Sequence, residues 1–242
     1  MNRDARHVAL KQVGADGQQR IASSSVLLIG VGGIGCAAAS YLASSGVGHI
    51  LLNDFDTVDE TNLGRQILFG PADVGQLKAE VAAQELSALN PDIRLTPLTA
   101  RLDEAALTHT IDEVDIVLDG SDNFATRFLV NDACVNAGCC LVSGSAIRLE
   151  GQVAVFGPDY STSPCYRCLY ADADESLENC AGNGVLAPVP GVIGSLMAVE
   201  ALKHLAGIDS PRGELQLYDA GNGRFQSVNI AKKKGCPICS HP

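Results

Sequence analysis

The chain has 242 residues, of which 46% are hydrophobic and 19% charged, and its formal net charge at pH 7 is -11. This balance is typical of a globular protein, and the acidic excess argues against nucleic acid as the main ligand, because lysine and arginine supply the affinity for a phosphate backbone. The charged N-terminal segment MNRDARHVALKQ lacks the apolar core of a signal peptide, and no run approaches the roughly 18 apolar residues of a membrane helix. We therefore expect a cytoplasmic protein that binds neither nucleic acid nor membrane.

The first half of the chain alternates short apolar runs with helical patterns. The apolar runs have the length and composition of buried strands, and the segments between them show helical spacing. Strands that alternate with helices predict a parallel sheet with right-handed crossovers. The predicted strands cover residues 25–30, 49–54, 93–98 and 114–120, and the predicted helices cover 33–45, 76–89 and a polar stretch from Phe124.

The pattern changes after Gly144. Three later segments alternate apolar and polar residues without a helix between each pair, which indicates a mixed or antiparallel sheet. The predicted fold is therefore α/β, with a Rossmann-like parallel sheet that continues into a mixed or antiparallel sheet. The later strands are assigned to residues 151–156, 214–219 and 225–230, and one helix to 190–207 with Val192, Leu196, Val199 and Leu202 on its core face.

Three glycines follow the first predicted strand in the spacing G-x-G-x-x-G. Gly30, Gly32 and Gly35 stand between a strand and a helix, which is the context that a phosphate-binding loop requires. The amides at the start of such a helix point toward an anion, and the missing side chains let a phosphate approach. Asp54, at the end of the second predicted strand, stands where a ribose hydroxyl would be bound. A redox dinucleotide and ATP both fit this motif, and a merely tight turn is the plainer alternative.

The residues that follow favour ATP. Lys78 stands near the start of a helix, where the helix dipole disfavours a cation unless an anion is bound nearby, although an ordinary surface lysine is the alternative. Asp122 and Asn123 follow the fourth predicted strand at its carboxyl end, where ligands dock in open parallel sheets, and an aspartate there can coordinate Mg²⁺. The candidate ligands in the loop after the second strand are Asp56, Asn62, Arg65 and Gln66.

Two Cys-x-x-Cys pairs stand far apart in the chain. Cys165 and Cys168 form one pair, and Cys236 and Cys239 form the other. Tetrahedral zinc accepts four thiolates, and each pair supplies two on one turn. The separation exceeds that of a short zinc ribbon, so spacing alone favours zinc while a redox or disulfide role stays open.

These motifs resemble those of the ThiF/MoeB/HesA family, the bacterial relatives of ubiquitin-activating enzymes, over essentially the whole chain. GVGGIG, DFDTVDETNLGRQ, GQLKAE, GSDNFATR, CYRC, GVIGSLMAVEALK and GCPIC occur in the family's order. The resemblance implies an adenylyltransferase that uses ATP and Mg²⁺, and it makes the four cysteines a closed, structural zinc site. The ATP-binding residues that it implies match Gly33, Asp54, Thr61, Asn62, Leu63, Gly64, Arg65, Lys78, Asp122 and Asn123, to which the residue patterns add Gly30, Gly32, Asp56 and Gln66.

The resemblance also implies catalytic roles. Arg65, Lys78 and Mg²⁺ on Asp122 would offset charge on the leaving pyrophosphate, and in the family the arginine that matches Arg6 reaches across a homodimer interface into the neighbouring site. The nucleophile would be a carboxylate that is already ionised at neutral pH, so no general base is required. Cys180, in the acidic loop DADESLENCAGNG, matches a cysteine that takes part in sulfur transfer in the family. The nearby carboxylates should raise its pKa, so a plain loop residue is the alternative.

We therefore expect ATP-dependent adenylation of the C-terminal glycine of a small ubiquitin-like sulfur-carrier protein that ends in Gly-Gly, in molybdopterin or thiamine synthesis. A separate sulfur-donor protein would then complete the thiocarboxylate. In this single domain, residues 1–22 form an arm, 23–145 the nucleotide-binding part and 146–242 the carrier-binding part with the zinc. A nicotinamide dehydrogenase would explain the glycine loop but not Arg65 or the cysteine pairs. A non-catalytic scaffold subunit would not need Arg65 and Lys78.

Overall fold

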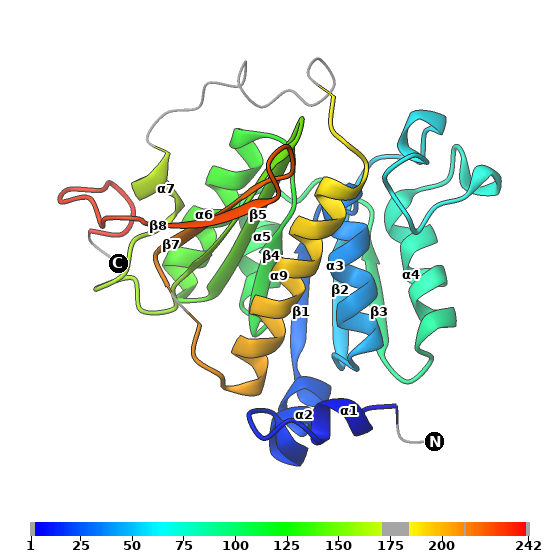
Figure 1. The fold of residues 1–242 in the computed structure, drawn as a ribbon, viewed down its shortest axis with the longest axis horizontal. Helices are drawn as coiled ribbons and strands as arrows, with labels where there is room; N and C mark the ends of the chain where they lie inside the picture. Colours follow the sequence, from blue (N-terminus) through cyan, green and yellow to red (C-terminus); the bar gives the residue numbers. More distant parts are fainter. Residues whose placement is uncertain (1–2, 171–183, 211, 241–242) are drawn as a thin grey trace.

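The computed structural model describes residues 3–170, 184–210 and 212–240 (Figure 1). In this part of the chain eight strands form one sheet in the order β3-β2-β1-β4-β5-β6-β7-β8. The strands from β3 to β5 are parallel, and β6, β7 and β8 each run antiparallel to the strand before, which confirms the predicted fold class. The strands are β1 (Ser25–Ile29), β2 (His49–Asn53), β3 (Arg94–Leu98), β4 (Ile116–Asp119), β5 (Cys140–Ile147), β6 (Glu150–Phe156), β7 (Glu214–Asp219) and β8 (Arg224–Asn229).

Helices cover both faces of the sheet. Val26 and Leu28 of β1 belong to the core under α2, α3, α4 and α9, and Leu27 and Ile29 belong to the core under α5, α6 and α7. Successive side chains of a strand point to opposite faces, so a strand covered on both sides is apolar throughout. The helices are α1 (Ala5–Val8), α2 (Gly14–Ser23), α3 (Gly33–Ser44), α4 (Lys78–Leu89), α5 (Glu104–Ile111), α6 (Phe124–Ala137), α7 (Tyr166–Leu169) and α9 (Pro188–Ala206), with short 3-10 turns η1 (Glu60–Asn62) and η2 (Pro71–Asp73).

The fifth parallel strand, β5, has no counterpart among the predicted strands. Ser143, Gly144 and Ser145 interrupt its apolar run, so its sequence lacks the pattern of a buried strand. The glycine has a packing reason, because a Cβ at Gly144 would lie 2.3 Å from the sulfur of Met197 on α9. The close approach of α9 therefore explains the glycine in this strand.

The core face of α9 differs from the predicted one. Val199 is 50% exposed, and Val192, Leu196 and Leu202 are only partly buried. The prediction was therefore wrong for Val199, whereas Leu196 and Leu202 pack against the core from its edge, and a second apolar stripe on the same helix, which the prediction missed, is buried. That stripe consists of Val189, Ile193, Met197, Ala201 and Leu205.

The length and apolar composition of α9 also match those of a membrane-crossing helix, and within the described ranges no other helix does so. The helix packs against α3, β5 and β6, and more than half of the stretch is buried inside the protein. Its apolar composition therefore reflects a place in the core.

Two contacts that only glycine permits hold α3 in place. A Cβ at Gly35 would lie 2.0 Å from the carbonyl oxygen of Gly30, so the start of α3 rests directly on the glycine loop. A Cβ at Gly194 would lie 2.2 Å from the carbonyl oxygen of Ile34, so α9 rests directly on α3. No side chain separates these three segments at the points of contact.

We expect Gly194→Ala to lower the free energy of unfolding by about 1–3 kcal/mol, because the added methyl group overlaps backbone that must shift. Urea denaturation measures the change. Gly191→Ala is the matched control on the same helix, since an added Cβ there has no atom within 4 Å and alanine favours the helix. Equal unfolding midpoints for the two variants would contradict the close contact.

Candidate active site

A cavity of about 430 Å³ opens at the carboxyl ends of β1, β2 and β4. β1 pairs with β2 on one side and with β4 on the other, so the loops that leave these strands diverge at this point, where open α/β sheets bind ligands. Thr61, Leu63 and Gly64 do not line it. The predicted ATP-binding residues that do are Gly30, Gly32, Gly33, Asp54, Asp56, Asn62, Arg65, Gln66, Lys78, Asp122 and Asn123.

The glycine loop leads into α3, and no side chain caps the N–H groups at the start of this helix. Gly30 has φ +83°, which a residue with a side chain rarely adopts, and Gly32 is the N-cap of α3. Asp54 holds the loop against the end of β2, because its Oδ2 accepts the N–H of Val31 at 2.8 Å. The N–H groups of the first turn of α3 are therefore available to an anion in the cavity.

Asp54 is a buried carboxyl group with a raised pKa. Burial is the main cause of the rise, and the charge of Lys78 and the N–H groups of Asp56 and Val31 oppose it. Its Oδ1 accepts the N–H of Asp56 at 3.0 Å. Each carboxylate oxygen of Asp54 thus already accepts one backbone N–H. A hydrogen bond from a ribose hydroxyl would use the remaining lone pairs, and it stays a prediction.

The segment after β2 is a capped turn whose residues divide into two sets. Asp59 accepts hydrogen bonds from the N–H and the hydroxyl of Thr61 at 2.8 and 2.6 Å, and Asn62 Oδ1 accepts the N–H of Asp59 at 3.1 Å. Arg65 Nη1 donates to the Thr61 carbonyl oxygen at 2.9 Å. Thr61 therefore stabilises the turn from outside, whereas Asn62, Arg65 and Gln66 line the cavity.

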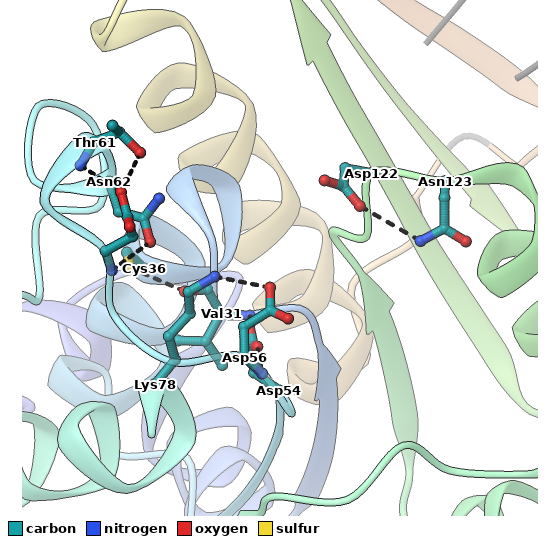
Figure 2. A network of polar contacts seen from close by, with 10 residues as sticks. Val31, Cys36, Asp54, Asp56, Thr61, Asn62, Lys78, Asp122 and Asn123 are labelled. Atoms are coloured by element: carbon teal, nitrogen blue, oxygen red, sulfur yellow. Dashed lines mark hydrogen bonds and ion pairs between the residues drawn. The ribbon is translucent and has the colours of Figure 1, made fainter. Parts of the chain in front are cut away.

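Lys78 is a buried cation at the start of α4. Its side chain is 9% exposed, and Nζ lies 3.0 Å from Oδ2 of Asp56, whose carbonyl oxygen also accepts the Lys78 N–H at 3.0 Å. Figure 2 shows Lys78, Asp54 and Asp56 close together. The surface-lysine alternative is therefore wrong. Because the Asp56 carboxylate is 57% exposed, an incoming phosphate can compete with it for the ammonium group.

Asp122 and Asn123 stand apart from this group, at the end of β4 (Figure 2). Asn123 is the N-cap of α6, and its Oδ1 accepts the N–H of Thr126 at 2.9 Å. Its Nδ2 reaches Asp122 Oδ1 at 3.4 Å. Asp122 itself is exposed, and an exposed carboxylate that lines a cavity is a suitable ligand for Mg²⁺.

Among the described residues, one predicted catalytic residue, Arg6, does not line the cavity. Arg6 is exposed on α1, which lies with α2 at the end of the sheet where β1 begins, opposite the glycine loop (Figure 1). The N-terminal arm is tied there, since Arg3 Nη1 donates to the Leu89 carbonyl oxygen at 2.9 Å. Cys180 lies outside the described residues.

Some side chains of the cavity wall are not among the predicted site residues. Phe55 and Arg101 both line the cavity, and Arg101 Cζ lies 4.5 Å from the centroid of the Phe55 ring. Arg127 also lines it, and its Nη2 donates to the Ser121 carbonyl oxygen at 2.7 Å. Phe55 stands between two predicted ligands and could have been found from that position, whereas Arg101 belongs to no motif.

The four cysteines of the two pairs form one buried cluster. Their sulfur atoms all lie within 4.8 Å of one another. The sulfur atoms of Cys165 and Cys236 are 3.8 Å apart and those of Cys168 and Cys239 are 3.5 Å apart, so the thiols are not joined in disulfides. The N–H of Lys233 points to the sulfur of Cys168 at 3.5 Å. Four convergent thiols with a backbone donor fit a tetrahedral structural zinc ion.

Comparison with known proteins identifies the family. The ThiF family matches residues 5–238 of the chain. The chain is 47% identical over 240 residues to the molybdopterin-synthase adenylyltransferase of Escherichia coli (strain K12), covering 99% of this chain and 96% of that protein. It is 45% identical over 237 residues to the sulfur carrier protein ThiS adenylyltransferase of the same organism, covering 98% and 94%. The crystal structure of E. coli MccB with ATP has a TM-score of 0.85 at 26% identity, covering 98% of this chain and 73% of that chain.

A cavity at the switch point of the sheet, with a glycine loop and a buried lysine, defines a nucleotide-binding α/β protein. The chain belongs to the ThiF family, as the motifs indicated. It is an adenylyltransferase, which is the activity that both named relatives share, and the dehydrogenase alternative is excluded.

We expect the purified protein to contain one zinc ion per chain and Cys236→Ser to lose it with a lower melting temperature, because a broken tetrahedral site no longer joins the end of the chain to α7. Elemental analysis and thermal unfolding measure the two effects. Cys139→Ser is the control, since Cys139 is a half-buried cysteine outside the cluster. Iron in place of zinc, or a disulfide between the pairs in reducing buffer, would contradict the assignment.

Proposed function

We propose that the chain uses ATP to adenylate the C-terminal glycine of a small ubiquitin-like sulfur-carrier protein, with release of pyrophosphate. The observation that carries the proposal is the meeting of Arg65 and Lys78 with the glycine loop in one cavity. The two relatives named for ThiS and for molybdopterin synthase support a sulfur carrier as the substrate. Because their identities to this chain differ little, the proposal names the class of carrier rather than the pathway.

The site favours adenylation because it supplies position and positive charge. The phosphates of ATP would lie at the amides of α3, where Lys78 can exchange the Asp56 carboxylate for phosphate oxygens. The carrier carboxylate attacks the α-phosphorus, and the bond to pyrophosphate breaks, so negative charge grows on the leaving group. Lys78 and Arg65 would offset this charge. No side chain has to remove a proton, since the nucleophile is already ionised.

Asp122 is the proposed ligand of Mg²⁺. Its carboxylate is exposed, lines the cavity and belongs to the loop after β4, opposite the lysine. The cation would neutralise phosphate charge and thereby favour pyrophosphate as the leaving group. Asn123 keeps the loop in place as the cap of α6.

The proposal includes a homodimer. The helix α1, which carries Arg6, lies at the end of the sheet where β1 begins (Figure 1), and the resemblance implies that this arginine acts in the cavity of a second chain. The outward side of α9 supports such a contact, since Val199 is 50% exposed and Val192 is only partly buried. A second copy would cover these apolar side chains.

The remaining parts of the proposal follow from the resemblance. Cys180 would act after adenylation, in sulfur transfer from a separate donor protein. Residues 146–242 would contact the carrier, and the protein would work in the cytoplasm.

Carrier-dependent exchange of radioactive pyrophosphate into ATP tests the proposed function. We expect exchange with a carrier that ends in Gly-Gly and none with the same carrier amidated at its C-terminus, because the amide has no ionised carboxylate. Calorimetric titration should show that Mg²⁺-ATP binds and that NAD⁺ does not bind comparably. An exchange rate that does not depend on the carrier, or tighter binding of NAD⁺ than of ATP, would contradict the proposal.

Lys78→Ala and Arg65→Ala should each raise the barrier of the exchange reaction by on the order of 2–4 kcal/mol, because each removes a charge that offsets the leaving group. The exchange rate at saturating ATP and carrier is the measurement. Arg94→Ala removes an exposed cation of β3 outside the cavity wall and should retain the rate. If the variant at position 78 or 65 exchanges pyrophosphate as fast as the Arg94→Ala control, that residue has no part in the mechanism.

A further inference from the structure

Lys232 lies beside the cysteine cluster without an assigned role. It is half-buried in the segment between β8 and the second cysteine pair. Its Nζ donates to the carbonyl oxygens of Ser161 and Cys239, both at 2.9 Å, and also to that of Tyr160. An ammonium group has three N–H donors, so these three carbonyl oxygens match its full capacity.

The carbonyl partners of Lys232 come from two segments that are far apart in the sequence. Tyr160 and Ser161 precede the first cysteine pair, whereas Cys239 is the last member of the second pair. Lys232 itself comes shortly before Cys236. One side chain therefore joins the two loops that carry the four cysteines.

The bonds of Lys232 also fix the position of the residue after it. The N–H of Lys233 points to the sulfur of Cys168 at 3.5 Å, and the carbonyl oxygen of Lys233 accepts the N–H of Cys236 at 3.2 Å. Hydrogen bonds to a metal ligand orient that ligand and tune its bond to the metal. Lys232 thus holds the backbone that supplies a donor to one cysteine of each pair.

The ammonium group of Lys232 has no carboxylate within 4.0 Å among the residues that the structure describes. Carbonyl dipoles alone offset its charge within this part of the chain. Four thiolates carry more negative charge than one Zn²⁺ neutralises, so the loaded site is anionic. A cation fixed on the ligand loop is therefore attracted more strongly to the loaded site than to four neutral thiols.

We propose that Lys232 is a positioning residue of the zinc site, and that its ammonium group raises the affinity for zinc by joining the two cysteine loops. Lys232 cannot be a ligand itself, because an ammonium group has no lone pair. It acts by holding the thiols close together before the metal binds, so that less conformational freedom is lost on binding. The inference goes beyond the proposed adenylation and rests only on the assignment of zinc to the four cysteines.

Competition of the zinc-loaded protein with chelators of graded affinity tests the proposal. We expect Lys232→Met to raise the dissociation constant of zinc by about 10- to 100-fold, because methionine keeps an apolar stem but none of the donors. Lys232→Arg should show a similar loss, since a planar guanidinium does not present three donors from one nitrogen. Lys234→Met is the matched control and should leave the constant unchanged, because Lys234 is exposed in the same segment and its ammonium group has no hydrogen-bond partner among the described residues.

The other outcomes overturn the inference. Unchanged zinc affinity in Lys232→Met would make the lysine merely structural, even if the melting temperature falls. Full affinity in Lys232→Arg would show that charge suffices without convergence on one nitrogen. A wild-type protein that holds no zinc would overturn the assignment of the metal together with this inference. The measurement needs neither ATP nor a carrier, so a failure of the proposed adenylation does not affect it.

Discussion

Backbone contacts without intervening side chains determine the geometry of the site. The Gly30 carbonyl oxygen lies where a Cβ of Gly35 would be, and the Ile34 carbonyl oxygen lies where a Cβ of Gly194 would be. At the first contact the start of α3 packs directly against the glycine loop, and at the second α9 packs directly against α3. Pro190 at the start of α9 consequently lines the cavity as well. Because close-packed backbone has little freedom to shift, the position of the anion-binding amides follows from core packing.

Several cationic side chains meet in the cavity of a protein whose net charge is negative, although three aspartates also line it. Lys78 comes from the start of α4 and Arg65 from the capped turn before it, and both reach one cavity. In the free protein Asp56 offsets the buried ammonium group at 3.0 Å. The long-range field of the protein disfavours an anionic nucleotide, so these local charges and the helix amides must supply the attraction. Burial strengthens them, because electrostatic interactions are less screened away from water.

The sequence predicts features that depend on local pattern. It does not predict features that are set by contacts between segments far apart in the chain. The parallel strands and the glycine loop are visible as apolar runs and glycine spacing. The core face of α9 is not visible in the same way, because Val192 and Val199 satisfy helical spacing as well as the buried residues do, and packing against α3, β5 and β6 selects between the faces. In the turn before α4, the spacing of residues along the sequence does not reveal that Thr61 lies outside the cavity and donates hydrogen bonds to Asp59. Arg101 reaches the cavity because hydrogen bonds from Asn53 hold its loop, which no local motif signals.

A crystal structure of the protein with Mg²⁺ and a non-hydrolysable analogue of ATP tests the central claim, that this cavity binds ATP through helix amides and a lysine released from its carboxylate. The expected result is electron density for the phosphates at the first turn of α3, with Nζ of Lys78 moved from Asp56 to a phosphate oxygen. A nucleotide bound elsewhere on the protein, or phosphates in the cavity with Lys78 still paired to Asp56, would contradict the claim.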